Sequence, residues 1–202
     1  QTPRIHRRGL CISRGSMDGL EVWGEPKMKE AVRKVVIKFG VPLVLASSGL
    51  ATFLHDWEAD KKQATKVYAD RLARGIPTVC DGITPATSPY PVIVGDVWSQ
   101  ERCDEVNRMV VEKTQLKLLD CVKTRISQYT FDALSSHAHN VGVGNTCASK
   151  ALGLINAGRL AEGCRALAYT PSGDPNWSFV TENGKAVYVP GLHNRRKAEM
   201  VM

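Results

Sequence analysis

Residues 131–144, FDALSSHAHNVGVG, form the stretch that decides the fold. Their apolar residues recur at helical spacing and predict a helix from about Thr130 to His139. Gly142 and Gly144 end this helix, because glycine favours backbone conformations outside the helical region. The stretch therefore predicts a helical second half of the chain, in which helices are separated by short turns.

More helices are expected downstream of this stretch. Residues 149–155 and 159–169 predict a helical hairpin around the turn Asn156-Ala157-Gly158. Residues 170–190 contain three prolines and two glycines, so a loop is expected there. A last helix is predicted to start near Leu192.

Upstream of the stretch, a small irregular or β portion precedes a long helix. Ser99 is a candidate N-cap, and apolar residues follow it at roughly helical spacing as far as Ile126. Residues 68–90 are rich in Gly, Pro, Thr and Ser, and Thr78-Val79-Cys80 within them is a β-type stretch. We therefore expect a hairpin and loops between 68 and 90.

Three blocks of this sequence resemble the phage muramidases of glycoside hydrolase family 24. The blocks are residues 131–144, the turn at 154–158 and the segment 191–199, GLHNRRKAE, and they occur in the order that the family has. The resemblance extends over residues 39–202. It implies an α+β, mostly helical, lysozyme-like fold with a small β-hairpin lobe and a larger helical lobe. It also implies hydrolysis of the β-1,4 bonds between N-acetylmuramic acid and N-acetylglucosamine in peptidoglycan, which lyses the host cell.

The catalytic residues of that family match Glu58, Asp70 and Thr78 in this chain. Glycoside hydrolysis uses one carboxyl group as the proton donor and a second as base or nucleophile. The resemblance assigns the acid to Glu58, the base to Asp70, and the hold on the attacking water to Thr78. The intervals between these residues, twelve and eight positions, are longer than in the family pattern. Asp60 is the alternative to Glu58 as the acid.

Further residues of the matching blocks are expected to contact the glycan. These candidates are His137, Asn140, Asn194 and Arg195, and His137 stands where the family has Phe. No cofactor is implied, and the chain has no Cys/His spacing typical of a zinc site. We therefore expect a monomeric enzyme whose partner is the peptidoglycan glycan strand. The alternative is a catalytically inactive, membrane-tethered peptidoglycan-binding protein.

An uncharged run of sixteen residues, 39–54, FGVPLVLASSGLATFL, precedes Glu58. Basic residues before the run and acidic residues after it would keep its N-terminal end in the cytoplasm. As a helix the run would be about 24 Å long, which is short for a membrane span. A buried core helix and a cleaved signal peptide are therefore alternatives. Because half of the run is Gly, Ala, Ser, Thr or Pro, it resembles the weak anchor of signal-anchor-release endolysins, which are tethered inactive at the host inner membrane and later released into the periplasm.

These observations divide the chain into three parts. Residues 1–35 are basic and expected to be disordered, residues 36–57 are expected to be an anchor helix that becomes the first helix of the enzyme, and residues 58–202 the catalytic domain. The net charge is +7, and residues 1–38 hold nine Lys or Arg against four Asp or Glu. Since the positive charge gathers at one end, we do not expect nucleic acid as a partner.

The cysteines indicate an oxidising compartment, because five of the six follow the apolar run on the side that would be exported. Cys103 and Cys121 lie on one predicted helix, roughly 27 Å apart, whereas a disulfide needs Cα atoms within about 7 Å. Cys147 and Cys164 flank the helical hairpin and are expected to pair. Cys11 precedes the run and is expected to stay outside any disulfide. The five cysteines after the run are Cys80, Cys103, Cys121, Cys147 and Cys164.

Overall fold

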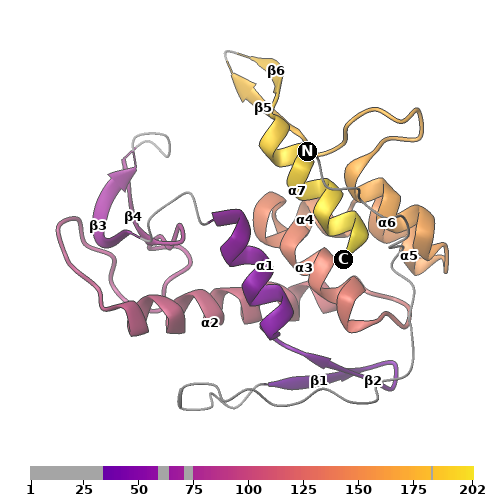
Figure 1. Ribbon diagram of the computed structural model, residues 1–202. Coiled ribbons are helices and arrows are strands. Elements are labelled where there is room, and N and C mark those ends of the chain that lie inside the picture. Colours follow the sequence, from indigo (N-terminus) through magenta and orange to yellow (C-terminus); the bar gives the residue numbers. More distant parts are fainter. Residues whose placement is uncertain (1–33, 59–63, 71–74, 183) are drawn as a thin grey trace, which may run out of the picture.

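The computed structural model describes residues 34–58, 64–70, 75–182 and 184–202. These ranges contain seven helices and three two-stranded antiparallel sheets. One long helix, α2, runs from a small lobe into a larger helical lobe (Figure 1). In chain order the elements are β1 (Val35–Lys38), β2 (Val41–Val44), α1 (Ser48–Glu58), β3 (Ala64–Asp70), β4 (Ile76–Cys80), α2 (Gln100–Leu119), α3 (Gln128–Val141), α4 (Val143–Cys147), α5 (Lys150–Asn156), α6 (Leu160–Ala168), β5 (Phe179–Glu182), β6 (Lys185–Tyr188) and α7 (Pro190–Val201).

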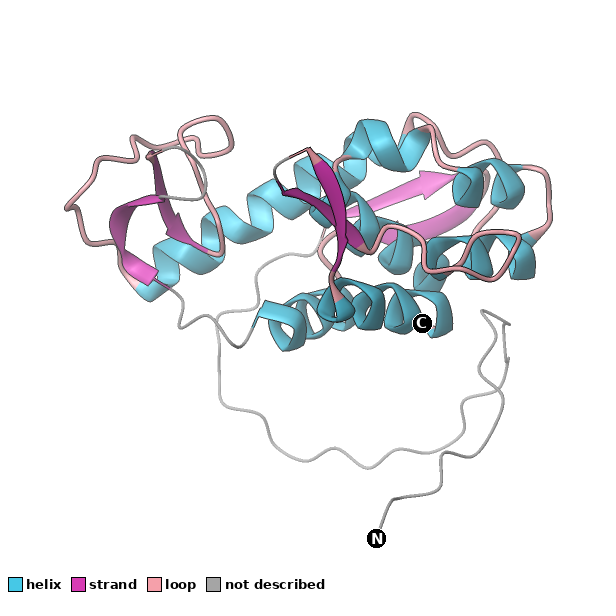
Figure 2. Ribbon diagram, turned by 90° about the horizontal axis from the view of Figure 1, so that it is seen from above, coloured by secondary structure: helices cyan, strands magenta, loops and turns pink. Residues whose placement is uncertain are grey.

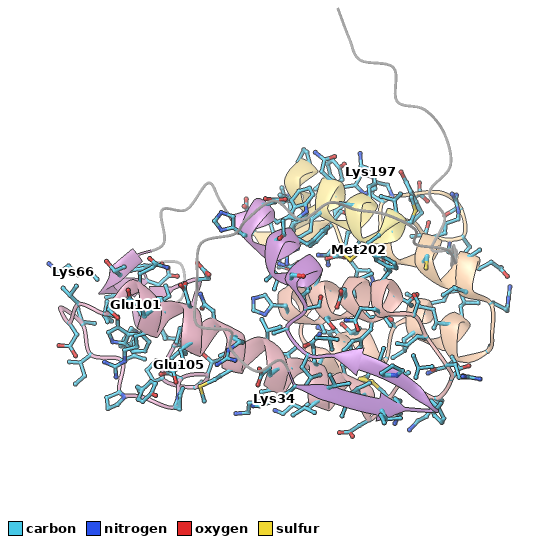
Figure 3. The ribbon with its side chains drawn as sticks, turned by 60° about the horizontal axis from the view of Figure 1, so that its bottom comes forward. Lys34, Lys66, Glu101, Glu105, Lys197 and Met202 are labelled. Carbon is cyan, nitrogen blue, oxygen red and sulfur yellow. A yellow bond between two sulfur atoms is a disulfide. The ribbon has the colours of Figure 1, made fainter. Side chains whose placement is uncertain are left out.

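The small lobe is built on the β3–β4 hairpin and the first half of α2. The two strands pair antiparallel, with Tyr68 opposite Thr78. Figure 3 shows Lys66 on β3 and Glu101 and Glu105 on α2, on the outside of this lobe. A hairpin is therefore present, but its first strand begins at Ala64, before the predicted range 68–90. The apolar core of the lobe consists of Val67, Val79, Cys80, Ile83, Val92, Trp98, Cys103 and Val106.

The helical lobe is organised around α3, which is buried from Thr130 to Ala138 and packs against α1, α2, α4 and α7. Seen from above, the long helix connects the small lobe to the cluster of helices that forms the larger lobe (Figure 2). The hairpin α5–α6 packs closely, since a Cβ at Gly163 would lie 2.4 Å from Cγ1 of Ile155. Only glycine therefore fits at that crossing. The core of the lobe includes Leu43, Leu45, Leu118, Leu119, Val122, Ile126, Phe131, Ala133, Leu134, Ala138, Ala151, Leu152, Ile155, Ala166 and Leu167.

Serine caps start four of the helices, as expected for this residue type, and at α1 the Ser47 hydroxyl accepts a hydrogen bond from the Leu50 amide (3.0 Å). The hydroxyl of Ser99 accepts a hydrogen bond from the Arg102 amide (3.2 Å) at the start of α2, which confirms the predicted cap. Ser127 and Ser149 start α3 and α5 in the same way. The predicted helix at 130–139 exists as α3 but is longer at both ends.

In the folded enzyme the helix predicted over 36–57 is absent from the first half of that range. Residues 35–44 form the β1–β2 hairpin, and α1 begins only at Ser48. The two-residue turn of the β1–β2 hairpin has positive φ at Phe39 (52°) and Gly40 (75°), which is the geometry of a type I′ turn. Pro42 is a further reason why this segment forms a strand and not a helix, because proline interrupts a helix but is tolerated in an edge strand. Within the described ranges, no helix has both the length and the apolar character needed to cross a membrane.

Polar side chains of α2 and α3 hold the segment that joins β2 to α1. The Gln128 amide group bonds both backbone groups of Val44 (2.8 and 3.0 Å), and the Ala46 amide donates to Oε1 of Gln115 (2.7 Å). Next to them the hydroxyl of Ser47 donates to the Asp132 carboxylate (2.7 Å). Side chains therefore supply hydrogen-bond partners for the backbone groups between β2 and α1, as buried backbone groups require.

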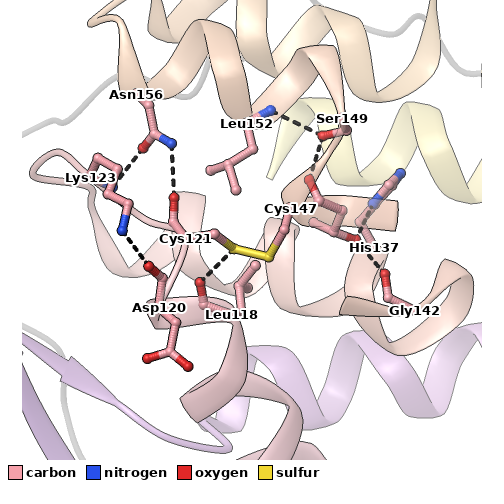
Figure 4. Close-up of a disulfide and its surroundings, with 11 residues drawn as sticks. Leu118, Asp120, Cys121, Lys123, His137, Gly142, Cys147, Ser149, Leu152 and Asn156 are labelled. Carbon is pink, nitrogen blue, oxygen red and sulfur yellow. Dashed lines mark hydrogen bonds between the residues drawn. A yellow bond between two sulfur atoms is a disulfide. The ribbon is translucent and has the colours of Figure 1, made fainter. Parts of the chain in front are cut away.

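Two disulfides are present, and neither is the predicted pair. Cys80 is bonded to Cys103, and Cys121 to Cys147, while Cys164 is buried outside both bonds. The prediction of a Cys147–Cys164 bond is wrong because the short helix α4 turns Cys147 toward the end of α2 rather than toward α6 (Figure 4). The prediction that Cys103 and Cys121 do not pair is confirmed. Cys11 lies outside the described residues.

The segment 170–190, predicted as loop, contains a third hairpin. Strands β5 and β6 pair antiparallel from Phe179 opposite Tyr188 to Glu182 opposite Lys185. The hairpin projects from the helical lobe just before α7 (Figure 1), and all of its strand residues are exposed.

Candidate functional site

The first candidate catalytic residue, Glu58, is the last residue of α1. Leu50 and Leu54 on the inner side of this helix pack against Val111 of α2. This packing fixes the end of α1 where the chain passes from the helical lobe to the small lobe. The alternative acid, Asp60, lies outside the described residues.

The other two candidates, Asp70 and Thr78, lie on the β3–β4 hairpin. Thr78 is opposite Tyr68, and Asp70 is opposite Ile76. Directly opposed residues point to the same face of a sheet, so Asp70 and Thr78 are diagonal neighbours on one face, typically about 7–8 Å apart. The hydroxyl of Thr78 is buried and donates to the carbonyl of Ile76 (3.0 Å). The strand pairing thus places Asp70 and Thr78 on one face of the hairpin.

Two links fasten this hairpin to α2. Cys80, two residues after Thr78, is joined to Cys103 with a Cα–Cα distance of 5.5 Å. The side-chain amide of Asn107 on α2 donates a hydrogen bond to the carboxylate of Asp81, the residue after Cys80 (2.5 Å). Sequence reasoning missed both links. They hold the end of β4, and with it Thr78, against a rigid helix.

The four predicted glycan contacts divide into two exposed and two buried residues. Asn140, near the end of α3, and Asn194, in the first half of α7, are exposed. His137 is fully buried, with its Nδ1 atom 2.9 Å from the hydroxyl of Thr146. Arg195 is also buried. Both side chains contribute to packing in this structure.

Burial explains the protonation state of His137. It lowers the pKa of the imidazole to about 3, with further lowering by the charges of Arg196 and Arg195. The ring also stands edge-on to Trp177, with 5.1 Å between the ring centroids. Burial and the charge of Arg195 lower the pKa of the neighbouring His139 to about 4. Both histidines are therefore neutral at physiological pH.

A buried ionic cluster connects α3 to α7. The carboxylate of Glu199 accepts hydrogen bonds from Arg196 (2.8 Å) and from the hydroxyl of Ser136 (2.7 Å). The guanidinium of Arg195 contacts the same carboxylate at 3.5 Å. Burial raises the pKa of Glu199, while Arg196 and Ser136 act in the opposite direction. The spacing of Arg and Glu on α7 was the sequence signal for this cluster, since residues three and four apart share a helix face.

In the described ranges, no group of three His, Cys, Asp or Glu side chains is placed to hold a metal ion. What the residues do offer is a carboxylic residue at the end of α1, and a carboxylate and a hydroxyl on one face of a hairpin. This is a set of groups that can donate a proton, accept one and hold a water molecule.

Comparison with known proteins relates this arrangement to one family. The family model for phage lysozyme matches residues 57–199. The SAR-endolysin of Pseudomonas phage phiKMV is 33% identical over 156 residues, which cover 77% of this chain and 88% of that protein. Among solved structures, the endolysin from Escherichia coli O157:H7 phage FAHEc1 has a TM-score of 0.60 and 29% identity, covering 77% of this chain and 90% of that one. The muramidase domain of SpmX from Asticaccaulis excentricus has a TM-score of 0.63 at 23% identity, covering 76% and 93%, which concerns the fold alone. The predicted lysozyme-like, mostly helical α+β fold is thus confirmed.

Proposed function

Because the chain belongs to the phage lysozyme family, we propose that it is an endolysin that cleaves the β-1,4 bonds between N-acetylmuramic acid and N-acetylglucosamine. One observation carries this proposal: the family model extends from Trp57 to Glu199 and so includes the end of α1, the β3–β4 hairpin and α7. The relatives are named as endolysins, which favours an active enzyme over an inactive tethered protein.

The proposed mechanism uses Glu58, Asp70 and Thr78. The Glu58 carboxyl group gives its proton to the glycosidic oxygen as the bond from that oxygen to the anomeric carbon breaks. A water molecule attacks the anomeric carbon, and its proton passes to the Asp70 carboxylate. The Thr78 hydroxyl donates a hydrogen bond to the Ile76 carbonyl. Its oxygen can therefore accept a hydrogen bond from the attacking water.

We also propose that residues 39–54 tether the enzyme at the host inner membrane before it is released, as a monomer, into the periplasm. The SAR-endolysin relatives support this, as does the charge asymmetry around the run. In the folded enzyme the same residues form the β1–β2 turn, β2 and most of α1. A membrane-inserted helix would therefore be a second conformation of this segment.

The bond specificity can be tested on purified sacculi from a Gram-negative bacterium. We expect the enzyme to release muropeptides whose reducing ends are N-acetylmuramic acid, because a muramidase adds water at that sugar. Borohydride reduction followed by chromatography and mass spectrometry identifies the reduced sugar. Reducing N-acetylglucosamine would contradict the bond assignment, and intact sacculi would favour the inactive binding protein.

The tether can be tested by making the run more hydrophobic without disturbing the folded core. Ser48 and Thr52 are exposed on α1, so Ser48→Leu with Thr52→Leu leaves the packing of the enzyme unchanged. Each Leu favours membrane insertion by about 0.5 kcal/mol. We expect the double variant to stay in the membrane fraction and to delay lysis, while Ser48→Gln with Thr52→Gln does not. Lysis on the wild-type schedule from the soluble fraction would refute the tether but not the lysozyme activity.

A further inference from the structure

A row of aromatic rings runs from the exposed β5–β6 hairpin to the end of α6. The rings of Phe179 and Tyr188, opposite each other on the hairpin, have centroids 5.6 Å apart. Tyr188 is followed by His193 of α7 at 6.0 Å, and His193 by Tyr169 at 5.2 Å. The guanidinium of Arg165 lies over the Tyr169 ring, 5.1 Å from its centroid. The exposed rings of the hairpin are therefore linked, through the buried ring of His193, to Tyr169 and the cation of Arg165.

This row is exposed at its hairpin end and rigidly held at its base. Phe179 and Tyr188 are 48% and 42% exposed, although large rings lose favourable burial energy when they face water. Beneath them His193 is buried, with its Nδ1 atom 3.2 Å from the hydroxyl of Ser178. The Val189 amide donates to the Ser178 carbonyl (2.8 Å), which closes the base of the hairpin. Exposed rings on a preorganised support are typical of binding surfaces, because few side-chain rotamers have to be fixed on binding.

The chemistry of the row fits a glycan that carries acidic groups. The face of an aromatic ring is electron-rich, and the C–H bonds on the face of a pyranose sugar are its natural complement. Arg165 at the far end can form paired hydrogen bonds with a carboxylate. Peptidoglycan, the substrate under the proposed function, combines both features, since its sugars carry lactyl groups and stem peptides with carboxylates.

The position of the hairpin agrees with a long ligand. In Figure 1 the hairpin rises from the start of α7 on the side of the molecule where α1 ends at Glu58. A polymeric strand that occupies the catalytic residues can continue along the molecule beyond the bond that is cut.

We propose that the aromatic row, Phe179, Tyr188, His193 and Tyr169 with Arg165, is an accessory binding site for the peptidoglycan glycan strand. The sugars stack on Phe179 and Tyr188, and a carboxylate of the strand pairs with Arg165. This inference rests on the proposed function, because it takes its ligand from it.

The hairpin supplies its own matched control. Val180 and Val187 oppose each other on the other face and are 37% and 38% exposed. The test measures binding of the full chain to sacculi by co-sedimentation, in a Glu58→Gln background that prevents digestion. We expect Phe179→Ser with Tyr188→Ser to bind about tenfold more weakly, and Val180→Ser with Val187→Ser to bind nearly as well as the parent. Equal losses in both pairs, or a loss in neither, would overturn the proposal.

Two further arms identify what the row recognises. Chitin beads present a β-1,4-linked backbone of N-acetylglucosamine without lactyl groups, peptide or carboxylate. The variant Phe179→Ser with Tyr188→Ser should therefore bind chitin more weakly as well, whereas Arg165→Gln should bind only sacculi more weakly. If the variant Phe179→Ser with Tyr188→Ser bound sacculi more weakly but bound chitin as well as the parent, the proposed stacking of sugars on the two rings would be wrong. Circular dichroism checks the fold, and Phe179→Leu with Tyr188→Leu, which keeps apolar side chains, should reproduce the loss.

The failure of this inference and that of the proposed function are distinguishable. Muropeptide release by the unmodified enzyme reports the activity alone, and the co-sedimentation difference between the two hairpin faces reports the accessory site alone. Active enzyme with no difference between the two faces would refute only the accessory site.

Discussion

Glu58→Gln is expected to lower the rate at which the enzyme clears a suspension of chloroform-treated Gram-negative cells by about a thousandfold. The amide has almost the volume of the carboxyl group but cannot donate a proton to the leaving oxygen. Because Glu58 ends α1 and Leu50 and Leu54 supply the packing of this helix, the fold should be kept. Circular dichroism and the urea midpoint should therefore match those of the parent enzyme.

The matched control is Asp56→Asn, an exposed residue of the same helix two positions earlier, which should clear cells at the parent rate. Asp70→Asn should lose most of the activity as well, because the attacking water would lack its base. Near-normal clearing by Glu58→Gln would remove Glu58 from the mechanism and make Asp60 the candidate acid.

Glu199→Leu is expected to lower the free energy of unfolding by about 3–5 kcal/mol, the usual cost of removing one partner from a buried ion pair. The substitution takes the acceptor away from Arg196 and Ser136. Two buried guanidinium groups then remain without a counter-charge. Since domains of this size are stable by only about 5–15 kcal/mol, the variant should unfold at a much lower urea concentration.

The chain contains an exposed counterpart of this pair. Arg159 and Glu162 form an ion pair with the same i, i+3 spacing as Arg196 and Glu199, but their side chains are more than half exposed. Glu162→Leu should leave the urea midpoint unchanged, because solvent screens exposed pairs. If Glu199→Leu unfolded at the parent midpoint, the buried cluster would contribute nothing to stability.

Local sequence signals predicted the elements that local interactions determine. Ser99 starts α2 because a serine hydroxyl satisfies a free amide of the first turn. The β1–β2 hairpin was not predicted, because the apolar content of the run 39–54 outweighed Gly40 and Pro42, which indicate a turn and a strand. The β5–β6 hairpin also had a signal, since Asn183-Gly184 between two β-rich segments is a typical hairpin turn.

Interactions between distant segments could not be predicted from one sequence. The Cys121–Cys147 bond depends on how α4 turns the chain after α3, and no spacing rule contains that turn. His137 and Arg195 were expected to contact the glycan because they lie in the blocks that resemble the family. They are buried because side chains of other helices satisfy part of their polar groups: Thr146 of α4 for His137, and Ser136 of α3 for Arg195.

The catalytic trio was predicted from family resemblance and stays a prediction, but its setting is structural. The pairing of β3 with β4 places Asp70 and Thr78 on one face, and the family pattern did not indicate how that face is held. The Cys80–Cys103 bond and the Asn107–Asp81 hydrogen bond supply that support.

The four leucines of the uncharged run have a double duty if the run is the tether proposed above. In the folded enzyme all four are buried: Leu43, Leu45, Leu50 and Leu54. Each must therefore be compatible with two environments, the lipid bilayer and the protein interior. Phenylalanine at these positions would satisfy a bilayer yet overfill a close-packed core, and alanine would leave a cavity in the core and weaken the hold on lipid. The timing of lysis can therefore change without loss of stability only through substitutions at the outward-facing residues of the run. The leucines are constrained both by membrane insertion and by core packing.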